Sequence, residues 1–165
     1  MPLEIERKFL VTGDAWRQQI ERSVEMRQGY LAGEGGRASV RVRLEGEVAK
    51  LNIKAAVVGS ARAEYEYEMP ADECREILAT LCVGRVEKTR HYVPARGAHD
   101  DAVWEIDEFV GDNAGLVVAE IELLTIDATF ERPLWLGREL TGERRYYNHA
   151  LALHPYMAWA EGELS

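Results

Sequence analysis

The stretch Glu4-Ile5-Glu6-Arg7-Lys8-Phe9-Leu10-Val11, close to the N-terminus, decides the prediction of the fold. Side chains alternate along a β-strand, so Glu4, Glu6 and Lys8 lie on one face and the apolar residues largely on the other. Six strands of the chain, this one included, carry charged residues at alternate positions. This pattern predicts a polar interior or groove that binds both cations and a polyanion. The other five carry the charged face at Arg41/Arg43, Glu64/Glu66/Glu68, Lys88/Arg90, Glu105/Asp107 and Glu120/Glu122.

Length and composition predict a single globular domain over residues 1–165, since 47% of the residues are hydrophobic and 30% are charged. No run approaches the roughly 18 apolar residues that a membrane span requires, and the chain is charged from Glu4 onward. We therefore expect a cytoplasmic protein without a membrane partner. The formal net charge of −9 disfavours nucleic acid as a partner, because nucleic-acid binders carry a basic footprint.

The two cysteines, Cys74 and Cys82, fall in one predicted helix. Eight helical residues span about 12 Å, which is too far for a disulfide, so we expect free thiols that are buried or partly buried. The four histidines show no spacing typical of a zinc site. A metal in this protein would therefore be held by oxygen ligands.

The hydrophobic pattern and the turn residues predict a mainly β fold of about eight strands with few helices. Short strands joined by hairpin-like turns favour an antiparallel sheet, and eight strands are enough to close a barrel around one small ligand. The glycines at 33, 35 and 36 do not open a helix or precede Gly-Lys-Ser/Thr, which favours a loop over a phosphate-binding P-loop. Strands are expected at about 3–11, 26–31, 39–44, 48–54, 63–69, 85–93, 102–109 and 116–124, and helices at 14–23, 71–82, 127–131 and 148–159 with an interruption at Pro155.

Charges gathered inside a barrel need partners, because an unpaired buried charge costs several kcal/mol. Clustered carboxylates without histidine or cysteine favour Mg²⁺ or Mn²⁺, and arginine and lysine donors suit phosphate oxygens. A wall of acids opposite a wall of bases would form a site for a triphosphate. The alternative is that each charged face is merely solvated and linked by weak cross-strand salt bridges.

An ordered set of motifs along nearly the whole chain resembles the CYTH superfamily, the triphosphate tunnel metalloenzymes. The Glu-x-Glu-x-Lys signature of that family matches Glu4, Glu6 and Lys8. The resemblance implies a closed tunnel of eight antiparallel strands with peripheral helices and a C-terminal helix at one mouth. The further matching segments are 27–31, 40–43, the strand end at Lys54, 64–66, 87–90, 105–107, 120–122 and 145–152.

The resemblance also implies roles for individual residues. On the metal side it places Glu4, Glu6, Asp107, Glu120 and Glu122, with Glu64 and Glu66 as further acidic positions whose role stays open. On the phosphate side it places Lys8, Arg41, Arg43, Lys54, Lys88, Arg90 and Arg145. The catalytic set that we infer is Lys8, Glu120, Asp107 and the tunnel-facing Tyr30.

The C-terminal motif departs from the family pattern. Similar sequences often carry lysines where this chain has Arg144, Tyr147 and His149. Arg145 is therefore the matching base of this segment, and a phosphate role for the flanking positions does not follow from the resemblance.

The resemblance implies an enzyme, with metal-dependent hydrolysis of inorganic tripolyphosphate to pyrophosphate and phosphate as the first expectation. A class IV adenylate cyclase and a thiamine or nucleoside triphosphatase are the enzymatic alternatives. A polyphosphate- or nucleotide-binding module without catalysis is the alternative from another class, although it would not need the acidic set. A homodimer is an open alternative to a monomer, because no stretch of the sequence marks an interface.

Overall fold

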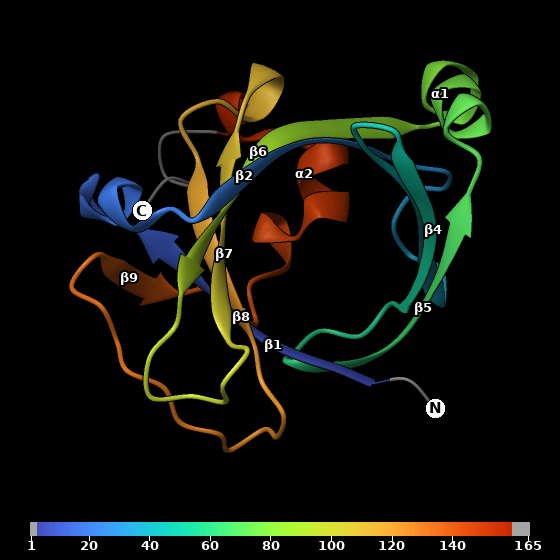
Figure 1. The fold of residues 1–165 in the computed structure, drawn as a ribbon. Coiled ribbons are helices and arrows are strands. Elements are labelled where there is room, and N and C mark those ends of the chain that lie inside the picture. The colour runs from blue at the N-terminus through green and yellow to red at the C-terminus, as the bar shows by residue number, and fades with distance from the viewer. Residues whose placement is uncertain (1–2, 160–165) are drawn as a thin grey trace.

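The computed structural model describes residues 3–159, which build a closed antiparallel barrel of eight strands (Figure 1). None of the helices in this part of the chain has the length and apolar character that crossing a membrane requires. The barrel strands are β1 (Leu3–Val11), β2 (Arg22–Tyr30), β3 (Ala38–Glu45), β4 (Val48–Ala55), β5 (Ala61–Met69), β6 (Gly84–Pro94), β7 (Val103–Phe109) and β8 (Val117–Glu122).

The first strand closes the barrel because its two halves pair with different neighbours. The sheet runs in the order β5-β4-β3-β2-β6-β7-β8-β1, and the start of β1 pairs back onto β5, with Glu4 opposite Arg62. The second half of β1 pairs with β8, where Glu6 lies opposite Glu122 and Lys8 opposite Glu120. The eight-stranded closed barrel predicted from the charge alternation is confirmed.

A short ninth strand, β9 (Leu136–Glu139), was not predicted. It pairs with the end of β1, where Phe9 lies opposite Glu139. Four residues carry too little periodicity to distinguish a strand from a loop. The element arises from the edge that β1 leaves open beyond its pairing with β5.

The helix expected at 14–23 is wrong. The structure has a short 3-10 helix, η1 (Ala15–Gln19), and β2 already begins at Arg22, opposite Tyr92 of β6. The helical spacing of Trp16 and Ile20 reflects burial of both side chains against the same outer core. The amide of Glu21 donates to the carbonyl of Tyr92, so strand pairing with β6 overrides the local pattern.

No helix forms at 127–131 either, where the chain crosses the outer core as an irregular segment and packs Phe130 against it. The expected helix at 71–82 is present as α1 (Ala71–Thr80). The tail forms α2 (Asn148–Leu153) and, after Pro155, the 3-10 helix η4 (Tyr156–Ala158), so the predicted interruption at Pro155 is confirmed.

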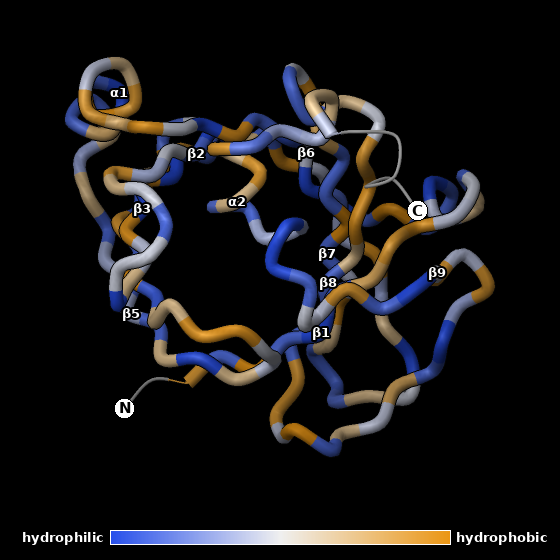
Figure 2. The backbone as a smooth tube through the Cα atoms, turned by 180° about the vertical axis from the view of Figure 1, so that it is seen from behind, coloured by the Kyte–Doolittle hydropathy of each residue, from blue (hydrophilic) through white to orange (hydrophobic). Residues whose placement is uncertain are grey.

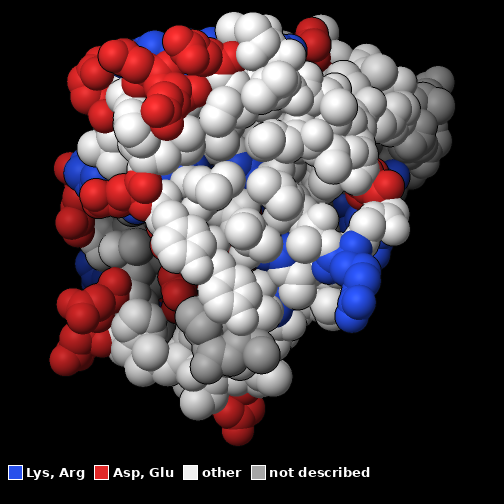
Figure 3. All heavy atoms as spheres, turned by 90° about the vertical axis from the view of Figure 1, so that its right-hand side faces the viewer, with Lys and Arg blue, Asp and Glu red and all other residues white. Residues whose placement is uncertain are grey.

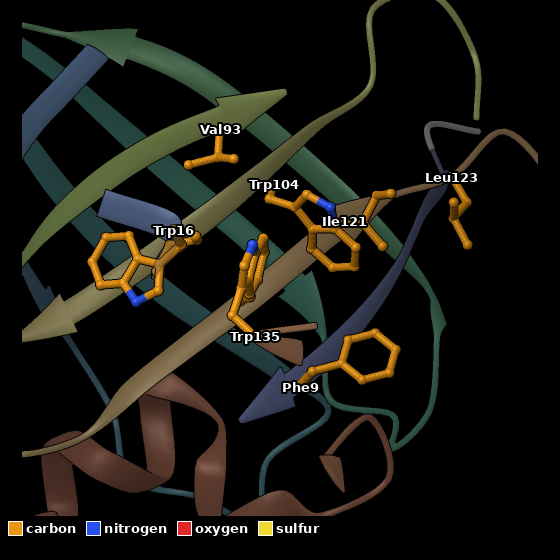
Figure 4. Close-up of a cluster of buried hydrophobic side chains, with 9 residues drawn as sticks. Phe9, Trp16, Val93, Trp104, Ile121, Leu123 and Trp135 are labelled. Atoms are coloured by element: carbon orange, nitrogen blue, oxygen red, sulfur yellow. The ribbon is translucent and has the colours of Figure 1, made fainter. Parts of the chain in front are cut away.

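The largest hydrophobic core lies outside the barrel wall, because the charged faces point inward. Trp104 and Ile121 project outward from β7 and β8 and pack with Phe9, Trp16 and Trp135 (Figure 4). The ring of Trp104 packs in T-shaped arrangements with those of Phe9 and Trp135, at centroid distances of 5.9 and 5.5 Å. Burial of these aromatic rings stabilises the wall that carries Glu6, Lys8 and Glu120 on its other face.

The helix α1 covers the outer face of β3 and β4. Its Cys74 and Leu78 pack on Val42 and Ala49, which alternate with the charged residues of those strands. Cys74 is buried, Cys82 is partly buried and both are free thiols, as predicted. Figure 3 shows acidic side chains gathered at the α1 end of this face, whereas Arg41 and Arg43 lie on the inner side of β3.

The helix α2 lies within the outline of the barrel in views from both directions (Figures 1 and 2). Its Leu151 packs with Tyr146 against Val86, Phe109 and Val118, which form an apolar layer at the ends of β6, β7 and β8. This layer closes one end of the barrel interior. The charged residues of the same strands lie further along the axis, toward the other end.

A tight backbone contact fixes α2 at that end, and we expect Gly84→Ala to loosen it. A Cβ placed on Gly84 would lie 2.6 Å from the carbonyl oxygen of Ala152 in α2, so the helix backbone would have to move. We expect a loss of about 1–3 kcal/mol in the free energy of unfolding, measured by urea denaturation. The control is Gly33→Ala, because a Cβ at Gly33 meets open space. Equal stability of the two variants would contradict the contact.

Candidate active site inside the barrel

The barrel encloses a cavity of about 640 Å³, within the range of small-molecule sites. Its wall combines acidic residues of β1 and β8 with basic residues of β3, β4 and β5. Arg144 of η3 (Arg144–Tyr146) and residues 147–149 at the start of α2 contribute to the lining as well. The predicted residues that line the cavity are Glu4, Glu6, Lys8, Tyr30, Arg41, Arg43, Lys54, Glu64, Glu66, Arg90, Glu120 and Glu122.

On the acidic side, three carboxylates are held by lysine and arginine. Lys54 Nζ lies 3.1 Å from Glu4, Arg62 lies 3.4 Å from Glu6, and Lys8 Nζ lies 3.2 Å from Glu120. Burial lowers the pKa of Lys54, and the nearby Glu6 and Glu4 act in the opposite direction. Each of these three pairs joins one carboxylate to one cation and is neutral as a unit.

The basic side is concentrated on β3, where Arg41 and Arg43 point into the cavity. No carboxylate pairs with Arg41 among residues 3–159, and its buried Nε has no hydrogen-bond partner there. Arg43 Nε donates to Gln28 Oε1 at 3.0 Å, and Glu45 lies 3.7 Å from its guanidinium. Burial and the neighbouring Arg41 lower the pKa of Arg43 to about 10. Such a concentration of positive charge favours a bound anion.

Lys88, Arg90 and Asp107 form a buried charge cluster on β6 and β7. Asp107 accepts hydrogen bonds from Lys88 Nζ at 2.7 Å and from Arg90 Nε and Nη2 at 2.7 and 2.9 Å. Burial alone would raise the pKa of Asp107, but Arg90 and Lys88 hold it well below its usual range. Burial lowers the pKa of Lys88, and Asp107 offsets this only in part. Arg90 reaches the cavity and also pairs with Glu105, whereas Lys88 and Asp107 lie behind the cavity lining.

Tyr30 lies at the cavity with its ring stacked on His149, at a centroid distance of 4.5 Å. Its hydroxyl accepts a hydrogen bond from Gln28 Nε2 at 2.9 Å. Among the further acidic positions, Glu64 accepts from Asn52 and Glu66 lies 3.3 Å from Lys50.

Arg145 is not brought to the cavity. Its guanidinium lies over the rings of Tyr146 and Trp159, at 5.1 and 5.0 Å from their centroids. The neighbouring Arg144 lines the cavity instead. The short 3-10 helix η3 decides which of two adjacent arginines points inward, and no periodicity in the sequence reveals this.

Several residues of the cavity were not predicted from the sequence. Arg62 and Asn52 continue the alternation of Glu64 and Lys54 on their own strands, so the period of two could have found them. No periodicity in the sequence marks Tyr147, Asn148 and His149 as lining residues, because their position depends on how the chain folds back into the barrel. Glu105 was placed on the charged face of its strand but given no role, and the further charged lining residues Arg144 and Glu34 were not predicted.

The chemistry of the acidic wall fits a divalent cation. Glu6 and Glu122 lie opposite each other on adjacent strands, as do Glu105 and Glu120, and oxygen-only donor sets suit Mg²⁺ or Mn²⁺. Within residues 3–159, no three acidic, histidine or cysteine side chains are already gathered as a metal cage. The carboxylates of Glu4 and Glu6 are instead in contact with Lys54 and Arg62.

Comparison with known proteins defines the class of this barrel. The profile of the CYTH domain family matches residues 2–150, and the chain belongs to this family. An inorganic triphosphatase from Acetivibrio thermocellus is 44% identical over 162 residues, covering 98% of this chain and all of the relative. An inorganic triphosphatase from Nitrosomonas europaea is 35% identical over 152 residues, covering 91% of this chain and 97% of the relative.

Solved structures agree with this membership. The crystal structure of the inorganic triphosphatase NE1496 superposes with a TM-score of 0.64 at 35% identity, covering 91% of this chain and 97% of that one. The PH1012 protein from Pyrococcus horikoshii OT3 superposes with a TM-score of 0.58 at 20% identity, covering 74% and 79% of the two chains. The second likeness concerns the fold alone.

Proposed function

We propose that this protein hydrolyses inorganic tripolyphosphate to pyrophosphate and phosphate with the help of a divalent cation. The observation that carries the proposal is the pair of inward-facing arginines on β3, where Arg41 has no carboxylate partner among the described residues. Two near full-length relatives at 44% and 35% identity are inorganic triphosphatases by name. An enclosed anion site opposite an acidic wall is what a metal-bound triphosphate requires.

The basic residues bind and orient the phosphates in this proposal. Arg41 and Arg43 offer planar donors to one part of the phosphate chain, and Arg90 adds a third guanidinium. Lys54 and Arg62 exchange their carboxylate partners for phosphate oxygens, which leaves Glu4 and Glu6 available to a cation. Substrate and cation would therefore bind cooperatively. The phosphates would take up the lysine and arginine, and the cation would take up the carboxylates that these bases release.

Glu4, Glu6, Glu120 and Glu122 are the residues that would hold Mg²⁺ or Mn²⁺. A bound cation would supply neutralisation of the charge on the phosphate oxygens. Lys88 and Asp107 act from behind the cavity in our proposal, because Asp107 fixes the guanidinium of Arg90 through two hydrogen bonds. Asp107 is then a positioning residue and not a metal ligand.

Hydrolysis needs in-line attack by water and stabilisation of charge, without a covalent intermediate. Glu120 lies beside Lys8 and can orient the attacking water and accept its proton. The water oxygen forms the new bond to the terminal phosphorus, and pyrophosphate leaves with the electrons of the broken P–O bond. Lys8, Arg41 and Arg43 offset the charge of the leaving group. Tyr30, beside His149 at the cavity, helps to keep the phosphate chain in line.

The test is phosphate release from tripolyphosphate, ATP and thiamine triphosphate, each with Mg²⁺, with Mn²⁺ and with EDTA. We expect rapid release from tripolyphosphate with either metal, little release from the other two substrates and complete loss with EDTA. Cyclic AMP and pyrophosphate from ATP would instead identify a cyclase. Tight binding of tripolyphosphate without turnover under every condition would identify a binding module.

A further inference from the structure

The ring of Tyr147 is fixed inside the barrel by both functions of its hydroxyl. The hydroxyl donates to the carbonyl of Thr141 at 2.6 Å and accepts from the amide of Gly59 at 3.1 Å. Thr141 follows β9, and Gly59 belongs to the loop between β4 and β5. The side chain therefore ties two separate parts of the barrel together and cannot turn away without breaking both bonds.

Two cations of the cavity lie against this ring. Lys8 Nζ is 5.2 Å from the centroid of Tyr147, and the guanidinium of Arg62 is 4.8 Å from it. All three residues line the cavity. The space that the phenol ring fills is thus flanked by an ammonium and a guanidinium, which is the environment that a phosphate group prefers.

The neighbours of Tyr147 hold its segment in place at several points. The carbonyl of Tyr146 accepts from Lys8 Nζ at 3.1 Å, and Asn148 Oδ1 accepts from Lys88 Nζ at 2.9 Å. His149 Nε2 lies 2.7 Å from the carbonyl oxygen of Ala32, in the loop between β2 and β3. The segment is therefore anchored to β1, β6 and this loop, which makes the ring a rigid part of the cavity wall.

Exposed carboxylates at the rim of the cavity disfavour a phosphate chain that extends outward. Glu34, Glu66 and Glu122 are exposed and line the cavity. Like charges disfavour a protruding polyanion at this rim. A chain longer than the site can enclose would have to extend either past these carboxylates or into the space of the Tyr147 ring.

We propose that Tyr147 occupies a latent phosphate subsite between Lys8 and Arg62 and thereby restricts the tunnel to triphosphates. This inference rests on the proposed function and specifies the substrate by its number of phosphates. The planar phenol ring is at least as bulky as one PO₃ unit, so its removal leaves room for a fourth phosphate beside two cations. The cation–π contacts keep Lys8 and Arg62 in place while no phosphate is there.

The experiment compares tripolyphosphate with tetrapolyphosphate in wild type, Tyr147→Ala and Tyr147→Phe. We expect Tyr147→Ala to raise the tetra-to-tri ratio of kcat/KM by about tenfold or more, since an added charge-assisted contact is worth at least that factor. Tyr147→Phe keeps the ring and is expected to keep the wild-type ratio. Tyr92→Ala is the matched control, because Tyr92 lies under Arg22 and does not line the cavity.

An unchanged ratio in folded Tyr147→Ala would overturn the inference, and so would an equal shift in Tyr147→Phe, which would assign the effect to the hydroxyl bonds. Calorimetric titration with each polyphosphate gives the same ratio as dissociation constants and needs no turnover. If wild type binds both compounds but hydrolyses neither, the proposed function fails while the binding ratio still decides the role of Tyr147.

Discussion

Arg41→Ala is expected to lower kcat/KM for tripolyphosphate by about 10²–10³-fold, the effect of removing one preorganised donor from a charge-stabilising site. The buried Nε of Arg41 has no hydrogen-bond partner among residues 3–159, so this donor is available to a ligand. Folding should be little affected, since removal of Arg41 relieves its repulsion of Arg43. Steady-state phosphate release and urea denaturation of the same variant check both expectations.

Two further variants separate geometry from charge. Arg41→Lys keeps the positive charge but lacks the planar fork, so we expect activity between that of wild type and Arg41→Ala. Arg27→Ala removes an arginine from neighbouring β2 that is about half exposed and lies 3.7 Å from Glu87. Its activity should remain that of wild type. A loss below fivefold for Arg41→Ala would contradict a direct contact with phosphate.

The barrel could be predicted from the sequence because its charged residues obey the strand period. Glu4, Glu6 and Lys8 alternate with residues that pack on the outer face, and Arg41 and Arg43 alternate with Val42 in the same way. In most globular proteins this pattern would mark a solvated surface. Here the walls face one another, and the cavity that they enclose needs the polar face inside.

Elements whose conformation depends on distant contacts could not be predicted in this way. The helical spacing at Trp16 produces only η1, since the following residues pair with β6. The strand β9 exists because β1 offers a free edge. In the candidate site, the alternation along the strands identified which residues share a face. It did not show how deeply each side chain lies in the barrel. Asp107 has the same orientation as Glu105 but lies too deep to line the cavity.

That depth leads to the second large effect, which concerns stability. Asp107→Asn is expected to lower the free energy of unfolding by about 3–5 kcal/mol, because Lys88 and Arg90 would remain buried without their shared counter-charge. Glu108→Gln is the matched control on the same strand. Glu108 pairs with Arg17 near the surface, where the side chains are 34% and 40% exposed, and such pairs contribute about 1 kcal/mol or less.

The dependence of stability on pH distinguishes a lost charge from lost packing. Because the folded state lowers the pKa of Asp107, this carboxyl stabilises the protein above the ordinary range of aspartate, and its contribution is lost as the pH falls below about 5. Wild type should therefore lose stability steeply between about pH 5 and pH 2, and Asp107→Asn less steeply. Parallel acid profiles from urea denaturation would show that Asp107 is not the ionised centre of the cluster. The pKa of Glu108 is also lowered, through its hydrogen bonds with Arg17 and His91, so Glu108→Gln should flatten the profile slightly. A clearly larger flattening in Asp107→Asn would establish that the buried carboxylate of Asp107 holds the wall behind the phosphate site.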